Sequence, residues 1–509
     1  MTIPGLRIEL KSDIPVYKQI AGGIRLALED GRLHTGGQLP PTRDLARQLG
    51  VNRNTVVAAY EFLSSDGLVR SHTGRGTFLV RTASDASADR PPAAQGDDPW
   101  FTAFSRAVER PGVGGLLSAY RVAISSEGIS FAGSYPAADL MPLESFRRAM
   151  AAVFRDRGVE PFSYGPTAGY PPLRDAISAG MRRKGSPVSS EEILVTNGSQ
   201  QALDLVFRAL LDPGDPVVVE DPTYTGALSV LGSLGARLVG VPLDDEGIRP
   251  DYLATALERH RPRVVYLQPT FQNPTTRVMG KARRDELLAL TARHRCLIVE
   301  DDWAGDLRFE GGDLPTLHAL DNGRHVIYIS TFSKKFLPGL RVGWVAAPES
   351  VLERLVALKQ IEDCGTSPLI QAALHAFLDE GGLDEHLQRV RPAYRERRDA
   401  MIRALEREMP QGVHWTRPLG GLFLWVTLPA GLDSGDLFVA AREHGVLVSR
   451  GELFHVDGGG RHALRLTYSA VSPEQIDAGI ATLGELLRER LRGGTREPVG
   501  RAAEAVPIL

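Results

Sequence analysis

The segment 330–343, "STFSKKFLPGLRVG", carries two adjacent lysines, Lys334 and Lys335, and an arginine, Arg341, seven residues after the first. It follows the apolar run "HVIYIS" (325–330), which is typical of a buried strand. A lysine amine held at a strand end can attack a carbonyl carbon, and a nearby guanidinium can bind an anion. The alternative is a solvated surface loop, so the other segments of the chain have to distinguish between the two.

Four other segments end apolar runs in groups that suit a small, cyclic, anionic ligand. "TNGSQQALD" (196–204) places small residues at a strand-to-helix junction, where backbone amides point at an anion. "VEDDW" (299–303) ends a strand in carboxylates, "EDPTYTG" (220–226) offers an aromatic ring, and "QPTFQNPTT" (268–276) offers a carboxamide. Each segment also has a structural interpretation as an N-cap, a turn or a packing residue. Their joint occurrence in this order favours a binding site.

These groups meet the demands of pyridoxal 5'-phosphate, whose aldehyde forms a Schiff base with a lysine. The phosphate needs amides at a helix start, hydroxyls and an arginine, while the ring needs a carboxylate at its nitrogen, an aromatic platform and a donor to its phenolic oxygen. We therefore predict that Lys334 forms the Schiff base and that Asp301 pairs with the ring nitrogen. The other predicted cofactor residues are Gly198, Ser199, Gln200, Thr331, Ser333 and Arg341 at the phosphate, Tyr224 at the ring face and Asn273 near the phenolic oxygen.

Between residues 129 and 490, strand-like and helix-like segments alternate. Short β-branched runs separated by amphipathic stretches predict an α/β domain with a mostly parallel sheet. Ligands bind at the carboxyl ends of the strands in such sheets, and the candidate residues lie there. The expected strands are 215–221, 263–269, 296–302 and 325–330, and the expected helices include 200–211 and 282–294.

The N-terminal residues predict a second, smaller domain. "PTRDLARQLG" (41–50), with Thr42 as N-cap, and "RNTVVAAYEFLSSDG" (53–67) form a helix-turn-helix pattern, and "LVRSHTGRGTFLV" (68–80) predicts a hairpin wing. The start of the second helix faces base edges in such domains, and flanking arginines contact the DNA backbone or minor groove. Isolated surface arginines are the alternative. The predicted DNA-binding residues are Arg43, Arg53, Asn54, Thr55 and Arg75.

Composition sets the broad class. A chain of 509 residues predicts two or more domains, and 43% hydrophobic and 24% charged residues are typical of globular proteins. No apolar run reaches the ~18 residues of a membrane helix, and the N-terminus lacks a signal-peptide pattern. Cys296 and Cys364 are too far apart in sequence to suggest a disulfide framework or a zinc cluster. These features predict a cytoplasmic protein with no membrane partner.

Charge is unevenly distributed along the chain. Residues 1–81 hold 11 Lys and Arg against 7 Asp and Glu, a net charge of +4, so the remainder carries −7 of the total of −3. A basic module on an acidic body favours an anionic partner for the N-terminal domain. Residues 83–99 are rich in Ala, Asp, Ser and Pro without large apolar side chains, which predicts a linker.

Residues 14–80 resemble a GntR-type winged helix over their whole length. The resemblance implies that this domain binds a double-stranded DNA operator. The matching positions are Tyr17-Lys18-Gln19-Ile20, Leu39-Pro40, Arg43, Leu45-Ala46, Thr55-Val56, Gly67 and Gly76-Thr77.

Residues 129–490 resemble the fold-type I aminotransferases in the order of their cofactor motifs. The resemblance implies a large domain with a mostly parallel sheet and a smaller C-terminal α+β subdomain. It implies that Lys334 is the catalytic lysine and that Lys335 is only its neighbour. In "FSYGPTAGYPPLRDAI" it implies that Tyr164 reaches the phosphate of the partner subunit. In "ALRLTYS" it implies that Arg465 holds a substrate α-carboxylate through two hydrogen bonds.

Two positions depart from this pattern in opposite directions. Relatives usually carry a tyrosine close after the ring-nitrogen aspartate, where this chain has Trp303, a cofactor-binding candidate with only an N–H donor and more bulk. This change disfavours transamination. Asn273 in "FQNPTT" is more like active aminotransferases than like regulator relatives, which usually have a His-Gln-hydrophobic version there.

A GntR-type winged helix joined to an aminotransferase-like domain resembles the MocR/GabR family of transcriptional regulators. The resemblance implies a head-to-tail homodimer that holds the cofactor as an internal aldimine on Lys334 and senses an amino compound or amino acid when it forms an external aldimine instead. The alternative is a pyridoxal-phosphate-dependent aminotransferase, or transaminase, acting on an amino acid and a 2-oxo acid. The expected boundaries are 1–82 for the winged helix, 83–110 for the linker, 111–490 for the aminotransferase-like domain and 491–509 for a disordered tail.

Overall fold

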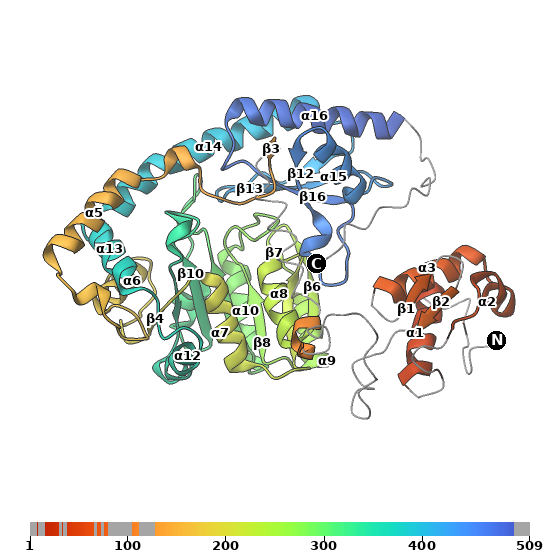
Figure 1. Ribbon diagram of the computed structural model, residues 1–509, viewed down its shortest axis with the longest axis horizontal. Helices are drawn as coiled ribbons and strands as arrows, with labels where there is room; N and C mark the ends of the chain where they lie inside the picture. Colours follow the sequence, from red (N-terminus) through yellow and green to blue (C-terminus); the bar gives the residue numbers. More distant parts are fainter. Residues whose placement is uncertain are drawn as a thin grey trace, which may run out of the picture. The chain divides into compact units, whose positions relative to one another are not determined.

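The computed structural model describes residues 16–29, 38–65, 69–72, 76–79, 104–110 and 128–492, together with Ile8 and Leu33. The chain divides into two compact units, Met1–Phe104 and Ser105–Leu509, which are described separately below (Figure 1). The division falls inside the segment predicted as the linker. The predicted C-terminal tail beyond Arg492 lies outside the described residues. Among the helices that are described, none is long and apolar enough to span a membrane.

The described residues of the first unit form three helices and a hairpin. Its elements are α1 (Val16–Glu29), α2 (Thr42–Leu49), α3 (Arg53–Ser65), β1 (Val69–His72) and β2 (Gly76–Leu79). Gly50, in the left-handed conformation at φ 66°, ends α2, and Tyr60 on α3 donates a hydrogen bond to the Pro40 carbonyl at 2.7 Å. The strands β1 and β2 pair antiparallel, as the predicted wing requires. Thr42 was expected to be the N-cap of α2, and this was wrong: Pro41 precedes the helix and no side chain caps it.

The second unit is built on an eight-stranded sheet of order β4-β11-β10-β9-β8-β5-β6-β7 (Figure 1). The neighbours from β10 through β9, β8 and β5 to β6 pair in parallel, whereas β11 runs antiparallel to both β10 and β4. The mostly parallel sheet predicted from the sequence is therefore confirmed. Its strands are β4 (Ile193–Thr196), β5 (Pro216–Asp221), β6 (Arg237–Asp244), β7 (Gly247–Ile248), β8 (Val264–Leu267), β9 (Leu297–Asp302), β10 (Val326–Thr331) and β11 (Gly343–Ala346).

Helices cover both faces of this sheet. Val217 and Val219 on β5 pack in the cluster that contains Leu203 of α7 (Ser199–Leu210), whereas Val218 packs with Leu253 of α9 (Pro250–His260). Successive side chains of a strand point to opposite faces, so a strand covered on both sides is apolar throughout. The other helices around the sheet are α5 (Leu143–Asp156), α6 (Pro171–Arg183), α8 (Thr225–Leu234), α10 (Lys281–Arg293), α11 (Leu317–Asp321), α12 (Glu349–Glu362) and α13 (Pro368–Asp379).

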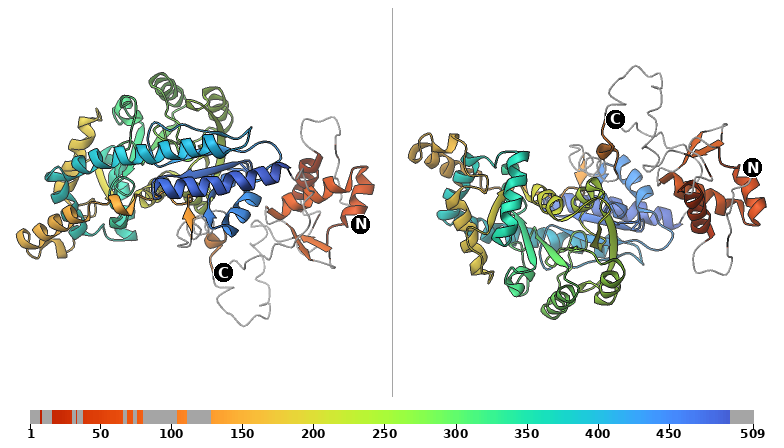
Figure 2. Two further views of the ribbon diagram at one scale, coloured as in Figure 1. Left: turned by 90° about the horizontal axis from the view of Figure 1, so that it is seen from above. Right: turned by 90° about the horizontal axis from the view of Figure 1, so that it is seen from below.

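The C-terminal part forms the expected α+β subdomain. Its antiparallel sheet has the order β12-β13-β16-β15, and a short parallel pair joins β14 to β3. The long helices α14 and α16 lie side by side in both the front view and the view from above (Figures 1 and 2). The elements are β3 (Ile129–Ser130), α14 (Gly382–Glu408), β12 (His414–Trp415), β13 (Phe423–Thr427), α15 (Ser434–Glu443), β14 (Val446–Leu447), β15 (Ser449–Arg450), β16 (Ala463–Thr467) and α16 (Pro473–Arg492).

The strand pairing explains how distant segments meet at one place. The strands β4, β5, β8, β9 and β10 all run in one direction, so their carboxyl ends share one edge of the sheet. Asp301 near the end of β9 lies opposite Ile329 of β10, two residues before Thr331. The residues that follow these strands are the ones in which the sequence predicted chemistry.

Candidate active site

Lys334 lies in the turn that follows β10. Its Nζ donates a hydrogen bond to the Ser134 carbonyl at 2.9 Å and lies 5.8 Å from the centre of the Tyr135 ring. Burial, with the charges of Arg465 and Arg341, lowers the pKa of Lys334 to about 8, and Asp301 partly opposes this shift. A lysine with a lowered pKa carries more of the neutral amine, which is the nucleophilic form.

The adjacent Lys335 has a different environment. It is buried, forms an ion pair with Asp306, and lies 4.9 Å from the Trp344 ring centre. Asp306 also pairs with Lys184. Burial favours the neutral form of Asp306, but the two lysines outweigh burial and hold its pKa well below the ordinary value. Lys335 is therefore committed to an ion pair, while Lys334 contacts one backbone carbonyl.

Asp301 is a buried carboxylate that is satisfied on one side only. Its Oδ2 accepts hydrogen bonds from the Tyr266 hydroxyl at 2.8 Å and from Gln268 Nε2 at 3.1 Å, whereas its buried Oδ1 has no partner among the described residues. Burial raises its pKa to about 6, although the two hydrogen bonds act in the opposite direction. Buried polar atoms are nearly always hydrogen-bonded, so the orphaned Oδ1 fits a site that expects a donor such as a protonated ring nitrogen.

The predicted anion-binding residues meet where β4 turns into α7. Gly198 precedes the helix with φ 83°, and Ser199 is its first residue, so first-turn amides without intrahelical partners lie here. Arg341 Nη1 donates to Ser333 Oγ at 3.3 Å, and Thr331 Oγ1 lies 3.0 Å from the same hydroxyl oxygen. Gly198 has φ 83°, a conformation that other residues rarely adopt, and a Cβ there would lie 2.6 Å from Arg341 Nη2, so a side chain at this position would be strained. This cradle fits a phosphate group.

Tyr224 and Gln200 stand beside this turn. The Tyr224 hydroxyl donates to Gln200 Oε1 at 3.2 Å, and Gln200 Nε2 donates to the Gly226 carbonyl at 2.9 Å. Burial raises the pKa of Tyr224 to about 12, so the phenol remains neutral. Gln200 thus orients the tyrosine that was predicted to stack on the cofactor ring.

Arg465 and Asn273 form a direct contact, which connects the C-terminal sheet to the main site. Arg465 Nη1 donates to Asn273 Oδ1 at 3.0 Å, and Nη2 donates to the Ala132 carbonyl at 2.8 Å, but in the part of the chain that the structure describes the buried Nε has no partner. The guanidinium lies 4.8 Å from the Phe423 ring centre and 4.9 Å from that of Phe454. Burial lowers the pKa of Arg465 to about 10. The free Nε–H is a donor suited to a carboxylate.

Trp303 was predicted to be a cofactor-binding residue, but its N–H contacts the protein backbone instead. Its Nε1 donates to the Phe271 carbonyl at 3.0 Å, and its ring stacks on Phe423 with centres 5.2 Å apart. Its only donor is therefore engaged by the backbone and not offered to a ligand. Tyr164, expected to reach a partner subunit, is 97% exposed in the single chain.

The described DNA-binding candidates lie on α2 and α3. Arg43 and Arg53 are exposed, Thr55 is half-buried, and Arg53 Nε lies 3.5 Å from Thr42 Oγ1, which ties the starts of the two helices together. The side chain of Asn54 and the whole of Arg75 fall outside the described residues.

Sequence reasoning missed the partners that hold the site together. Gln268, a partner of Asp301, stood in a segment already singled out, so its amide was available as a signal. Tyr266 lies inside an apolar strand pattern, where a tyrosine is ordinarily a packing residue. Ser134 contacts Lys334 through its backbone carbonyl, 200 positions away in sequence, and no side-chain pattern could reveal it.

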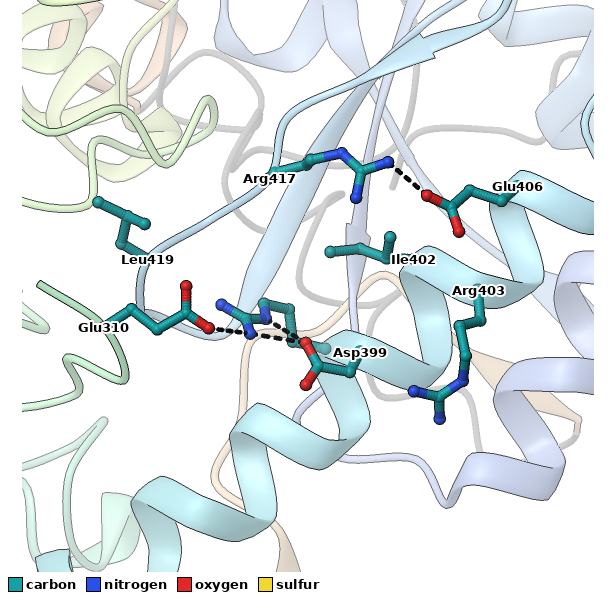
Figure 3. A pocket seen from close by; sticks show the side chains of 8 residues that line it. Glu310, Asp399, Ile402, Arg403, Glu406, Arg417 and Leu419 are labelled. Atoms are coloured by element: carbon teal, nitrogen blue, oxygen red, sulfur yellow. Dashed lines mark hydrogen bonds and ion pairs between the residues drawn. The ribbon is translucent and has the colours of Figure 1, made fainter.

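A surface cavity of about 420 Å³ lies along α14, away from these residues (Figure 3). Its charges are largely paired: Arg398 contacts Glu310 and Asp399, both at 2.6 Å, and Arg417 pairs with Glu406. No predicted site residue lines it.

Comparison with known proteins agrees with this geometry. Residues 132–483 match the family "Aminotransferase class I and II". The chain belongs to this family. Residues 16–79 match a second family, "Bacterial regulatory proteins, gntR family", so this class I and II aminotransferase domain follows a GntR domain. Both predicted resemblances are confirmed.

The relatives of the chain include both enzymes and regulators. An aromatic-amino-acid aminotransferase of Thermococcus litoralis is 39% identical over 72% of this chain and 90% of its own. The probable rhizopine catabolism regulatory protein MocR of Rhizobium meliloti is 30% identical over 94% of this chain and 95% of its own. The crystal structure of LysN, an α-aminoadipate aminotransferase of Thermus thermophilus, has a TM-score of 0.72 at 39% identity and covers 77% of this chain and 99% of its own.

Proposed function

We propose that this protein is a DNA-binding transcriptional regulator that holds pyridoxal 5'-phosphate on Lys334 and responds to an amino compound. One observation carries the proposal. A GntR domain with exposed arginines precedes a strand-edge site in which the Lys334 amine contacts a backbone carbonyl and, among the described residues, the Asp301 Oδ1 atom has no hydrogen-bond partner. Relatives that match nearly the whole chain support a regulator; one is the uncharacterized HTH-type transcriptional regulator YisV of Bacillus subtilis, 33% identical over 96% of this chain.

Each part of the site has a distinct binding task in this proposal. Bound pyridoxal phosphate supplies an aldehyde carbon that can combine with an amine. Asp301 accepts a hydrogen bond from the ring nitrogen through Oδ1, and the Gly198–Ser199 turn with Arg341 holds the phosphate. Tyr224 covers the ring face. Lys334, with its pKa lowered to about 8, has a larger neutral and nucleophilic fraction at neutral pH than an ordinary lysine.

Arg465 indicates which amino compounds suit the site. The two rings beside its guanidinium and the hydrogen bonds to Asn273 and the Ala132 carbonyl fix its orientation, and Nε is left for a ligand. A carboxylate would satisfy this buried donor and pair with the charge. We therefore expect an amino acid to bind more tightly than the corresponding simple amine.

A homodimer is part of the same proposal. Several aromatic and aliphatic side chains of one region are exposed in the single chain, among them Phe154, Val159, Phe162 and Tyr164 at 53%, 81%, 58% and 97%. Such a group of apolar side chains suits coverage by a second copy. In this proposal the dimer has two conformations that differ in operator affinity. An amino acid can change operator affinity only if it binds these two conformations with unequal affinity.

A metabolic aminotransferase is the second candidate, and one observation favours it. Asn273 makes the 3.0 Å contact with Arg465 that would orient a carboxylate-binding guanidinium, and the chain is 40% identical to a 2-aminoadipate transaminase of Thermus thermophilus. Against it, Trp303 uses its donor on the Phe271 carbonyl and offers no hydroxyl to the site.

The decisive experiment titrates the full-length protein with amino acids and amines and follows the visible absorbance and operator affinity together at fixed salt. A regulator requires one compound that changes both. Arg53→Ala should reduce operator affinity on the order of 10-fold without altering the absorbance. Arg47→Ala, an exposed arginine of α2 outside the predicted interface, is the matched control. Repeated turnover of an amino acid with 2-oxoglutarate, without any change in DNA binding, would favour the enzyme.

A further inference from the structure

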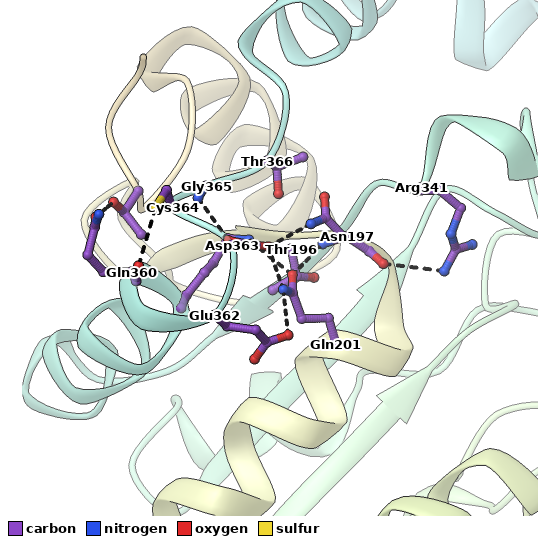
Figure 4. A network of polar contacts seen from close by, with 12 residues as sticks. Thr196, Asn197, Gln201, Arg341, Gln360, Glu362, Asp363, Cys364, Gly365 and Thr366 are labelled. Carbon is purple, nitrogen blue, oxygen red and sulfur yellow. Dashed lines mark hydrogen bonds and ion pairs between the residues drawn. The ribbon is translucent and has the colours of Figure 1, made fainter. Parts of the chain in front are cut away.

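Asp363, the residue that follows α12, is at the centre of a network of polar contacts (Figure 4). Its Oδ2 accepts from Asn197 Nδ2 at 2.6 Å, Gln201 Nε2 at 2.5 Å and Lys359 Nζ at 2.6 Å, and its Oδ1 accepts from the Gly365 amide at 2.8 Å. The Lys359 side chain is fully buried. Both carboxylate oxygens are therefore satisfied, and the network is internal to the protein.

The network fixes the residue that leads into the anion-binding turn. The side chain of Asn197 donates a hydrogen bond to Asp363, and its backbone N–H donates another to Gln201 Oε1 at 2.7 Å. The Asn197 carbonyl faces the other way and accepts from Arg341 Nη2 at 3.3 Å, as Figure 4 shows. Asn197 is thus held by α12 on one side and by the proposed phosphate-binding arginine on the other.

The end of α12 also contacts the segment that carries Tyr164. Gln360, three residues before Asp363, accepts a hydrogen bond from Thr167. A Cβ on Gly365 would lie 3.6 Å from the Thr167 Cα. The end of α12 and the residues that follow it therefore contact both the anion-binding turn and the 163–170 segment.

We propose that Asp363 is a positioning residue for phosphate binding. It holds Asn197 so that the amides of Gly198 and Ser199 and the guanidinium of Arg341 converge on the anion, without touching the anion itself. Lys359 keeps Asp363 ionised. This inference rests on the proposed function, because it supposes that the turn binds the phosphate of pyridoxal 5'-phosphate.

The test compares two ligands that differ only in the phosphate. Full-length protein stripped of cofactor is titrated with pyridoxal 5'-phosphate and with pyridoxal, and binding is followed by absorbance. Asp363→Asn should weaken pyridoxal 5'-phosphate on the order of 10-fold, as expected for losing well-oriented hydrogen bonds to a charged group, and leave pyridoxal unchanged. Glu362→Gln is the control, since Glu362 contacts Gln201 and Arg208 but not Asn197.

Asn197→Ala tests the same role if the Asp363→Asn variant does not fold. This substitution removes the side-chain hydrogen bond between Asn197 and Asp363 and leaves the Asp363–Lys359 ion pair intact. It should show the same selective loss for the phosphorylated ligand. An equal loss of both ligands, or no loss of either, would overturn the positioning role. Failure of the unaltered protein to bind either ligand would instead reject the proposed function.

Discussion

Two carboxylates at opposite ends of the site have opposite environments. Asp301 is buried, has one oxygen with no partner, and has a pKa raised to about 6 by burial. Asp363 is half-buried. Burial favours its neutral form, but hydrogen bonds from Gln201 and Lys359 outweigh it and hold its pKa below the ordinary value. The unsatisfied oxygen of Asp301 lies where we propose a ligand group, and the fully satisfied Asp363 has the role of a residue proposed to build the site.

The two adjacent lysines repeat this difference within a single turn. Lys334 donates to one carbonyl and has a lowered pKa, whereas Lys335 has a buried carboxylate partner. The two adjacent lysines therefore have different roles, because their side chains extend from the turn into different surroundings. Four predictions test whether this division between ligand-directed and structural groups holds.

The largest effect is expected for the lysine pair. Lys334→Ala should abolish the Schiff-base absorbance that the unaltered protein gives with pyridoxal 5'-phosphate, because the variant lacks the amine that forms the Schiff base. Lys335→Ala should keep the absorbance and lower thermal stability, since Asp306 loses one of its two cationic partners. Absorbance that survives in Lys334→Ala and disappears in Lys335→Ala would reverse the two assignments.

Asp301→Asn should weaken pyridoxal 5'-phosphate binding roughly 10- to 100-fold, the range for losing a hydrogen bond between charged groups. The control is the same substitution at Asp302. The oxygens of Asp302 are satisfied by the Tyr328 hydroxyl at 2.7 Å and the Gly305 amide at 2.9 Å. Equilibrium dialysis of both variants measures the affinities. Equal losses would show that the orphaned oxygen has no special role.

Asp301 and Asp363 should shift the stability of the cofactor-free protein in opposite directions with pH. Asp301 has a raised pKa, so its stabilising contribution is complete below its ordinary value of 3.8 and is lost as pH rises through about 6. Asp301→Asn should therefore stabilise the protein by up to about 3 kcal/mol above pH ~6, and by nothing below pH ~4. Asp363 has a lowered pKa, so Asp363→Asn should destabilise at neutral pH, by about 1–3 kcal/mol, and less as pH falls below the ordinary carboxyl range.

Urea unfolding followed by tryptophan fluorescence measures both effects, because four of the five tryptophans lie in the second unit. Two pH profiles of the same sign would contradict the distinction between the carboxylates.

The smallest effect is expected at Trp303. Trp303→Phe removes one hydrogen bond to the Phe271 carbonyl and keeps an aromatic ring against Phe423, so it should cost about 1 kcal/mol of stability. Cofactor absorbance and affinity should not change, because the indole N–H is a structural group. A shifted absorbance band would mean that the indole turns toward the ligand when the cofactor binds.

The sequence predicted the groups that follow apolar strands and failed where long-range contacts decide. Asp301 and Lys334 were predictable because each closely follows a β-branched run in an alternating α/β pattern, which places both at one sheet edge. The hydrogen bond that Trp303 donates could not be predicted, because its acceptor is a backbone carbonyl 32 positions away. Asp363 gave no signal, since a single aspartate after a helix is ordinary and its partner Asn197 lies 166 positions away.

In the N-terminal unit, the order of helices and hairpin was predictable from turn residues and apolar spacing, because these are local properties. The expected cap at Thr42 failed because the preceding Pro41 already occupies the N-cap position. Prediction thus succeeded for elements set by neighbouring residues and was weaker for details that depend on competition between adjacent positions.

The helix α8 connects two contacts that lie far apart in the sequence. It begins next to Tyr224, the residue proposed to cover the cofactor ring, and at its other end the Ser233 carbonyl accepts a hydrogen bond from Arg110 at 2.9 Å. A helix of ten residues is about 15 Å long. Arg110 is therefore bound at the far end of a helix whose start lies beside Tyr224. Ala227, Val230 and Leu231 of α8 are buried in one cluster with Val217 and Val219 of β5, so a movement of this helix would also repack one face of the sheet.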